Sequence, residues 1–199
     1  MRDPGSSGTS FLVGIGSKPG DNTTQYELNA YFNSSSQVDP LTGASDHGTA
    51  GGFFKFRQTL WRGGQQGMQV FGSLSAAADD KQPFSHFAEA GLTYLAPFDR
   101  AQDKLNLKAS YLQVNDHQLQ FQQRLRTAAG GDPELGKHHV YAVEANGHFA
   151  LTHNVAIEPS IQYIINPDNF YNPGATQLSN NGFVVGLLVV LDVGSVLGL

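Results

Sequence analysis

The sequence of 199 residues contains no cysteine and few charged residues. Without cysteine, the chain has no disulfide framework, no thiolate metal site and no cysteine nucleophile. Only 15% of the residues are charged and 23 are glycine, a composition that argues against a helical bundle or a coiled coil. The net charge of -5 gives no support to nucleic-acid binding, which needs a basic surface. The length suits one domain of moderate size over residues 1–199.

Long hydrophobic runs are also missing. The longest nearly unbroken apolar stretch extends from Phe183 to Leu191. This stretch is too short for a membrane-spanning helix, which needs about 20 residues, but it fits a tilted membrane-spanning strand of about 9–11 residues.

Apolar and polar residues alternate along much of the chain. Over residues 138–151, apolar or small side chains alternate with polar ones such as Glu144 and Asn146, and the alternation resumes over 154–164. A period of two gives each strand one apolar and one polar face. Two adjacent antiparallel strands of this kind are what a transmembrane β-hairpin requires, because lipid contacts one face and water the other.

The same period predicts an all-β fold, a transmembrane antiparallel β-barrel. The expected strands are residues 10–16, 24–34, 51–61, 67–76, 85–96, 104–114, 138–151, 154–164 and 183–193. Within the third of these, Phe54 and Phe56 would point outward, whereas Lys55 and Arg57 would share the polar side. Strict alternation would also place Phe53 and Trp61 on the polar side, which suits aromatic residues less well.

Short and long connections alternate between the predicted strands, with long ones at 35–50, 115–137 and 165–182. Residues 116–129 read as a short polar helix or an irregular loop, either solvated outside the barrel or folded into its lumen as a plug. Bacterial barrels combine short periplasmic turns with longer external loops, so we expect the turn at 152–153 to face the periplasm.

The strand count bears on completeness, because single-chain bacterial barrels normally have an even number of strands. Nine strands indicate that about half of the barrel is missing from this chain. If residues 10–16 formed no strand, the remaining eight would permit a small closed barrel.

Three stretches resemble a known family. Residues 157–167 (IEPSIQYIINP), 87–98 (FAEAGLTYLAPF) and 99–107 (DRAQDKLNL) resemble segments of the carbohydrate-selective porins of Gram-negative outer membranes, the OprB type. The resemblance covers roughly residues 66–193 and is weaker before them.

The resemblance implies a barrel of about 16 strands through which small sugars diffuse across the outer membrane. This chain would be the C-terminal part of such a barrel, with the N-terminal half absent. The expected partners are small sugars, outer-membrane lipid, and either a missing barrel half or further copies of the chain. No cofactor, metal or nucleic acid is expected.

A diffusive sugar pore needs no catalytic group, only a wet lumen whose side chains exchange hydrogen bonds with sugar hydroxyls. The two cations Lys55 and Arg57 would form a basic strip suited to a constriction. No nucleophile-elbow motif occurs in the sequence, so an enzyme is not expected. By parity, the candidate pore-lining residues are Glu27, Asn29, Lys55, Arg57, Glu89, Lys108, Glu144, Asn146, Glu158 and Gln162.

Two other interpretations fit the same alternation. A soluble β-sandwich or lectin-like binding module would turn the apolar face into a dry core. An eight-stranded membrane barrel would be closed and filled by side chains, without a conducting pore. Solubility without detergent and single-channel conductance separate these interpretations from a porin.

Overall fold

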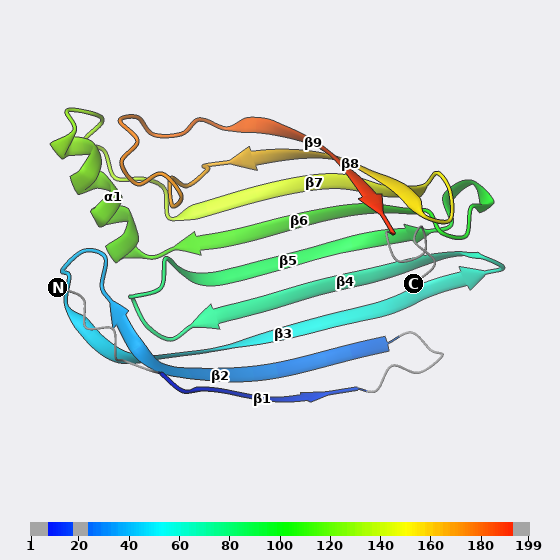
Figure 1. Ribbon diagram of the computed structural model, residues 1–199, viewed down its shortest axis with the longest axis horizontal. Coiled ribbons are helices and arrows are strands. Elements are labelled where there is room, and N and C mark those ends of the chain that lie inside the picture. Colours follow the sequence, from blue (N-terminus) through cyan, green and yellow to red (C-terminus); the bar gives the residue numbers. More distant parts are fainter. Residues whose placement is uncertain (1–7, 18–23, 193–199) are drawn as a thin grey trace.

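The structure is a computed structural model that describes residues 8–17 and 24–192. It is one antiparallel sheet of nine strands in sequence order, each paired with the next (Figure 1). The strands are β1 (Ser10–Gly16), β2 (Thr24–Val38), β3 (Ser45–Gly63), β4 (Gln66–Ala77), β5 (Phe84–Leu95), β6 (Lys104–Val114), β7 (His139–Ala150), β8 (Val155–Ile165) and β9 (Gly182–Leu191). A single α-helix, α1 (Asp116–Ala128), and a short 3-10 turn (Pro97–Asp99) complete the described residues.

The predicted all-β class and all nine predicted strands are confirmed. The end of the last one, Val193, lies outside the described residues. The predicted long connection at 35–50 is wrong, because β2 continues to Val38 and pairs there with Ser45 of β3. The added residues, 35–38 and 45–50, are mostly small and polar and lack apolar alternation, so the strands pair here through their backbones without a two-face pattern.

The pairing register determines which side chains share a face, because directly opposed residues of antiparallel strands point to the same side. Glu27 opposes Lys55, Lys55 opposes Ser73, and Ser73 opposes Glu89. Farther along the sheet, Lys108 opposes Glu144, which opposes Gln162. We call this side the polar face, and we call the other side, which carries Tyr26, Leu28, Leu107, Val143 and Ile161, the apolar face.

The apolar face is the more exposed of the two. On β7, Tyr141 and Val143 are exposed, whereas Glu144 and Asn146 are half-buried. Side chains on the inner side of a curved sheet converge and shield one another, so the polar face is the concave side. This arrangement is the reverse of a soluble protein, whose apolar residues lie inside.

A dry core of the kind that a β-sandwich needs is not found among the described residues. Their buried hydrophobic residues are Ala96, Val114, Leu119 and Ala156, which lie near strand ends or on the helix. The soluble sandwich therefore does not correspond to this structure.

A β-bulge changes the parity of β3. The register shifts between Thr59 and Trp61, so that Trp61 opposes Met68, which in turn opposes Tyr94 on the apolar face. The bulge therefore places Trp61 on the apolar face and not on the polar side that strict alternation would give. One extra residue in the strand turns the indole toward the apolar side.

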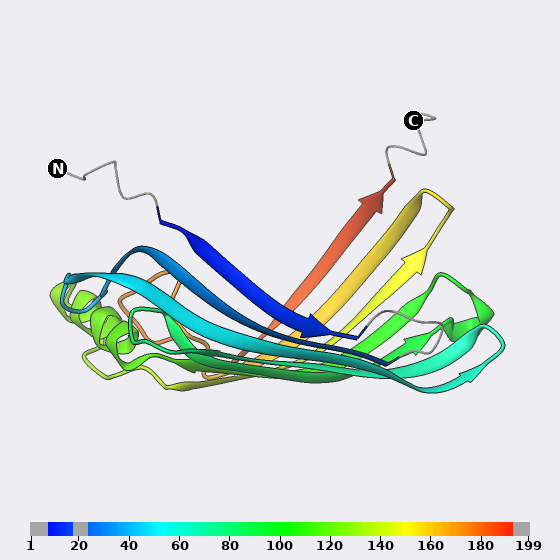
Figure 2. The same cartoon turned by 90° about the horizontal axis from the view of Figure 1, so that it is seen from below.

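The sheet is strongly curved but open. Figure 2 shows β1 and β9 rising from its two edges on the same side, and the described residues contain no pairing between these two strands. The presence of β1 and the open edges rule out the closed eight-stranded barrel for this structure. No helix among the described residues is long and apolar enough to cross a membrane.

The longer connections gather at one end of the sheet. Helix α1, the β2–β3 turn and the β8–β9 connection lie at the same end, opposite the short β3–β4 and β7–β8 turns (Figure 1). Residues 116–128 form the helix that was one of the two expectations for this segment.

Candidate pore lining

The register places all ten candidate residues on the polar face. They come from six strands: Glu27 and Asn29 from β2, Lys55 and Arg57 from β3, Glu89 from β5, Lys108 from β6, Glu144 and Asn146 from β7, and Glu158 and Gln162 from β8. Their role in lining a pore remains a prediction.

A hydrogen-bonded chain crosses the polar face from β5 to β7. The Thr93 hydroxyl donates to Asn106 Oδ1 at 2.7 Å, and Asn106 Nδ2 donates to Asn146 Oδ1 at 2.7 Å. Asn146 Nδ2 then donates to Glu144 Oε1 at 2.6 Å. Thr93 and Asn106 were not among the sequence candidates, although their parity could have identified them. Their short polar side chains complete the connection between the predicted residues.

The series of hydrogen bonds ends at Glu144, whose carboxylate contacts two further side chains. Lys108 Nζ lies 3.1 Å from Glu144 Oε2, and both side chains are partly buried. Gln162 Nε2 reaches the same oxygen at 3.5 Å. Three strands thus converge on one carboxylate, which fixes the side chains of this part of the polar face.

The cations on β3 are differently placed. Lys55 Nζ lies 4.8 Å from the centre of the Phe53 ring, a cation–π contact. Among the described residues, neither Lys55 nor Arg57 forms an ion pair with a carboxylate. Their donors therefore face open space beside Phe71. A hollow of about 620 Å³ lies there, and its lining includes Glu27, Lys55, Arg57, Phe71, Ser73 and Glu89.

A second hollow of about 600 Å³ lies on the polar face between β6 and β9. His148 Nδ1 lies 2.8 Å from Glu158 Oε1 in its lining, beside Asn106 and Asn146. Together the two hollows show that the polar face is recessed and carries donors and acceptors of both charges. Such a surface can exchange hydrogen bonds with a neutral hydroxyl-rich solute.

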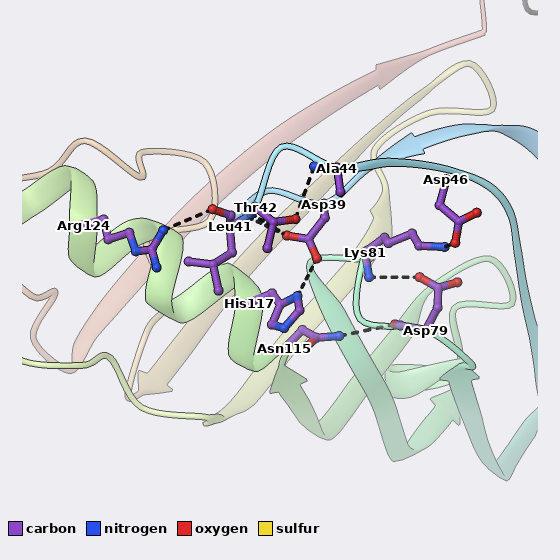
Figure 3. A network of polar contacts seen from close by, with 10 residues as sticks. All are labelled: Asp39, Leu41, Thr42, Ala44, Asp46, Asp79, Lys81, Asn115, His117 and Arg124. Atoms are coloured by element: carbon purple, nitrogen blue, oxygen red, sulfur yellow. Dashed lines mark hydrogen bonds and ion pairs between the residues drawn. The ribbon is translucent and has the colours of Figure 1, made fainter.

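Helix α1 is tied to the β2–β3 turn at the long-loop end of the sheet (Figure 3). His117 Nδ1 lies 2.6 Å from Asp39 Oδ2, and Arg124 Nη1 donates to the Leu41 carbonyl at 3.2 Å. Nearby, Asn115 Nδ2 donates to the Asp79 carbonyl at 3.3 Å. These contacts join the β2–β3 turn, the β4–β5 connection and the connection that contains α1. We call this set of contacts the rim network.

Asp39 and Lys81, which lie in connections at this rim, have shifted pKa values. Burial raises the pKa of the Asp39 carboxyl, but hydrogen bonds from the Thr42 amide, the His117 ring and the Leu41 amide outweigh it, so this pKa lies below its ordinary value. The hydrogen bond from Lys81 to Asp46, at 2.8 Å, raises the pKa of Lys81. Both groups therefore favour their charged forms at neutral pH.

An open-ended antiparallel sheet with an exposed apolar face and a recessed polar face defines the wall of a porin-like β-barrel. The model of the family described as "Carbohydrate-selective porin, OprB family" matches residues 2–190. This match begins well before residue 66, where the resemblance noted in the sequence begins. The chain therefore belongs to the OprB family of carbohydrate-selective porins. The family's description is that of porins, which are transport channels.

A solved structure has the same fold. The high-pH structure of Pseudomonas putida OprB superposes with a TM-score of 0.69 over 91% of this chain, at 19% sequence identity. This chain spans 47% of that chain, about half its length. No protein with a curated description matches this chain.

Proposed function

We propose that this chain forms part of the wall of a water-filled pore through which small carbohydrates diffuse passively across the outer membrane. Its polar face borders the water and its apolar face contacts lipid. The observation that carries the proposal is the exposure pattern: apolar residues such as Val143 are the exposed ones, while Glu144 and Asn146 are half-buried on the concave side. Hydrocarbon is the solvent that such a face needs.

The side chains of the polar face suit a neutral sugar. Among the residues that the structure describes, no carboxylate occupies the donors of Lys55 and Arg57, and Glu89 offers an acceptor on the same hollow. Phe71 adds an apolar surface against which the C–H face of a sugar ring can lie. Each contact is weak enough to be exchanged with water, which passage requires.

We also infer that further strands, the missing half of the barrel, complete the wall. In the described part of the chain, the outer edges of β1 and β9 have no strand partner, and their backbone groups must be satisfied within a membrane. The span of about half of the Pseudomonas putida OprB chain supports the same inference.

Single-channel recording in a planar bilayer tests the pore. We expect stepwise conductance of the assembled protein and saturable block of the current by D-glucose. Replacing Arg57 by Gln should weaken the block about three- to tenfold, the effect of one lost hydrogen bond. Arg62→Gln, at the turn end of the same strand, is the matched control.

A second readout does not depend on conductance. Because the chain lacks cysteine, single cysteines can be introduced at will. We expect a hydrophilic maleimide to label Glu144→Cys, but not Val143→Cys, in lipid vesicles. Labelling of Val143→Cys alone, or folding in water without detergent or lipid, would contradict the proposal.

A further inference from the structure

A hollow of about 470 Å³ lies outside the strand wall, at the long-loop end of the sheet. It is formed by α1, the segment before β7 and the two ends of the β8–β9 connection. The volume falls within the range of about 300–1,000 Å³ that is usual for small-molecule sites. Its polar lining includes Gln122, Lys137, Asn166, Asp168, Asn180 and Asn181.

The connection that encloses this hollow is held by its own side chains. Asn181 Oδ1 accepts a hydrogen bond from the Asn166 amide at 2.8 Å, which joins the two ends of the connection. Asn166 Nδ2 donates to the His139 carbonyl at 3.1 Å and fixes the connection to β7. Asn169 bonds Ser179 across the connection. The wall of the hollow is therefore preformed.

The helix supplies the floor. Gln122 is almost fully buried, with 1% of its surface exposed, and its Nε2 donates to Asp168 Oδ1 at 3.0 Å. The other Asp168 oxygen accepts a hydrogen bond from the Phe170 amide at 2.7 Å. The single carboxylate of the lining is thus held by the protein and contributes to the shape of the site.

Several polar groups of the lining remain unused. Within residues 8–17 and 24–192, no hydrogen bond or ion pair involves the side chains of Lys137 or Asn180. The Nδ2 of Asn181 and the Oδ1 of Asn166 also have no hydrogen-bond partner among the described residues. Carboxamides offer a donor and an acceptor side by side, which matches neighbouring hydroxyl groups of a sugar. Pro167, Leu178 and Gly136 add apolar surface.

We propose that this hollow is a binding site for a small neutral carbohydrate at the rim of the pore. One carboxylate and one ammonium balance the charge of the lining, so an uncharged, hydroxyl-rich ligand fits it better than an anion. The site would concentrate sugar at the long-loop mouth before entry into the lumen, and in this role it rests on the proposed pore function. The site itself is built from connections and not from the strand wall.

Ligand-observed NMR of the full chain in detergent micelles, with D-glucose as the probe, tests the site. Asn180→Trp should fill the hollow and abolish saturable binding at the rim. Asn180→Ala should weaken it about three- to tenfold, as expected for one or two lost hydrogen bonds. Asn172 lies in the same connection, is exposed, and does not line the hollow. Asn172→Trp and Asn172→Ala are therefore matched controls and should bind as the unchanged chain does.

The outcomes separate this site from the pore. Equal binding by the Asn180 and Asn172 variants would overturn the proposal, as would tighter binding of gluconate than of glucose. If Arg57→Gln weakens current block while the Asn180 variants bind normally, the rim site fails and the pore stands. If the Asn180 variants lose binding but glucose never blocks a current, the rim site stands and the pore function fails.

Discussion

Adjacent residues of one strand face opposite environments, and the contrast is clearest on β7. Val143 is 50% exposed on the apolar face, whereas its neighbour Glu144 joins the ion pair with Lys108 on the polar face. Parity alone located all ten candidate residues on one face, because the side-chain period of a strand is two. Alternation gives the wrong face for Trp61, because a β-bulge just before it adds one residue to the strand. The sequence contains no pattern that predicts this bulge.

The first prediction concerns lipid contact. Val143→Arg should destabilise the protein in lipid vesicles by about 2–4 kcal/mol, the cost of a cation facing the middle of the bilayer. Ala142→Arg, one residue away on the polar face, should cost far less. Urea titrations of both variants in vesicles measure the difference. Equal costs would mean that the apolar face does not contact lipid.

The second prediction concerns ion selectivity. Glu144→Gln removes one negative charge from the lining and releases Lys108 from its partner at 3.1 Å. The reversal potential in a salt gradient should therefore shift toward anion preference. Glu134→Gln, an exposed carboxylate outside the strands, serves as control and should leave the reversal potential unchanged. A shift toward cations would contradict the assigned position of Glu144.

Among the elements, the strands were predictable and the rim was not. Amphipathic alternation predicts every end of β4 to β8 to within one residue. The extension of β2 and β3 over residues 34–50 carries no such pattern and was taken for a loop. The contact between His117 and Asp39 joins residues 78 positions apart, which no local pattern reveals.

The third prediction concerns the pH dependence of the rim network. The folded-state pKa of Asp39 is depressed, so its stabilising contribution is present above the ordinary value of about 3.9 and is lost as the pH falls through the lower folded value. Hydrogen exchange of residues 39–44, corrected for the intrinsic rate, should therefore show protection at neutral pH that falls below about pH 4.

Two variants test the origin of that change. Asp39→Asn should lower protection at neutral pH and flatten its dependence on pH, since the ionised acceptor is gone. Asp80→Asn, an exposed carboxylate of the β4–β5 connection, should keep the full dependence. A pH step that survives in Asp39→Asn would assign it to another group.

For the whole molecule, the edges of the sheet matter most. The central strands are hydrogen-bonded on both sides, whereas β1 and β9 are bonded on one side only within the described residues. The sequence predicted an incomplete barrel from the strand count, but it gave no information on the curvature that Figure 2 shows. Curvature arises from twist and bulges along many strands, which side-chain alternation does not encode.

The fourth prediction follows from these edges. In detergent micelles, the amides of β1 and β9 in the isolated chain should exchange with solvent faster than those of β4 to β6, because each of these two strands pairs on one side only within the described residues. Exchange read strand by strand by NMR provides the measurement. Equal protection of edge and centre would show that copies of the chain already cover both edges.

The direction in which the two outermost strands travel limits what can close the cylinder. Successive neighbours reverse direction, so β1 and β9 both cross the membrane the same way. Additional strands that close the barrel must pair with β1 at one end and with β9 at the other. Both pairings can be antiparallel only if the number of additional strands is odd, which makes the total number of strands even. A second identical copy, oriented the same way in the membrane, would instead create two seams between strands that run side by side in a common direction.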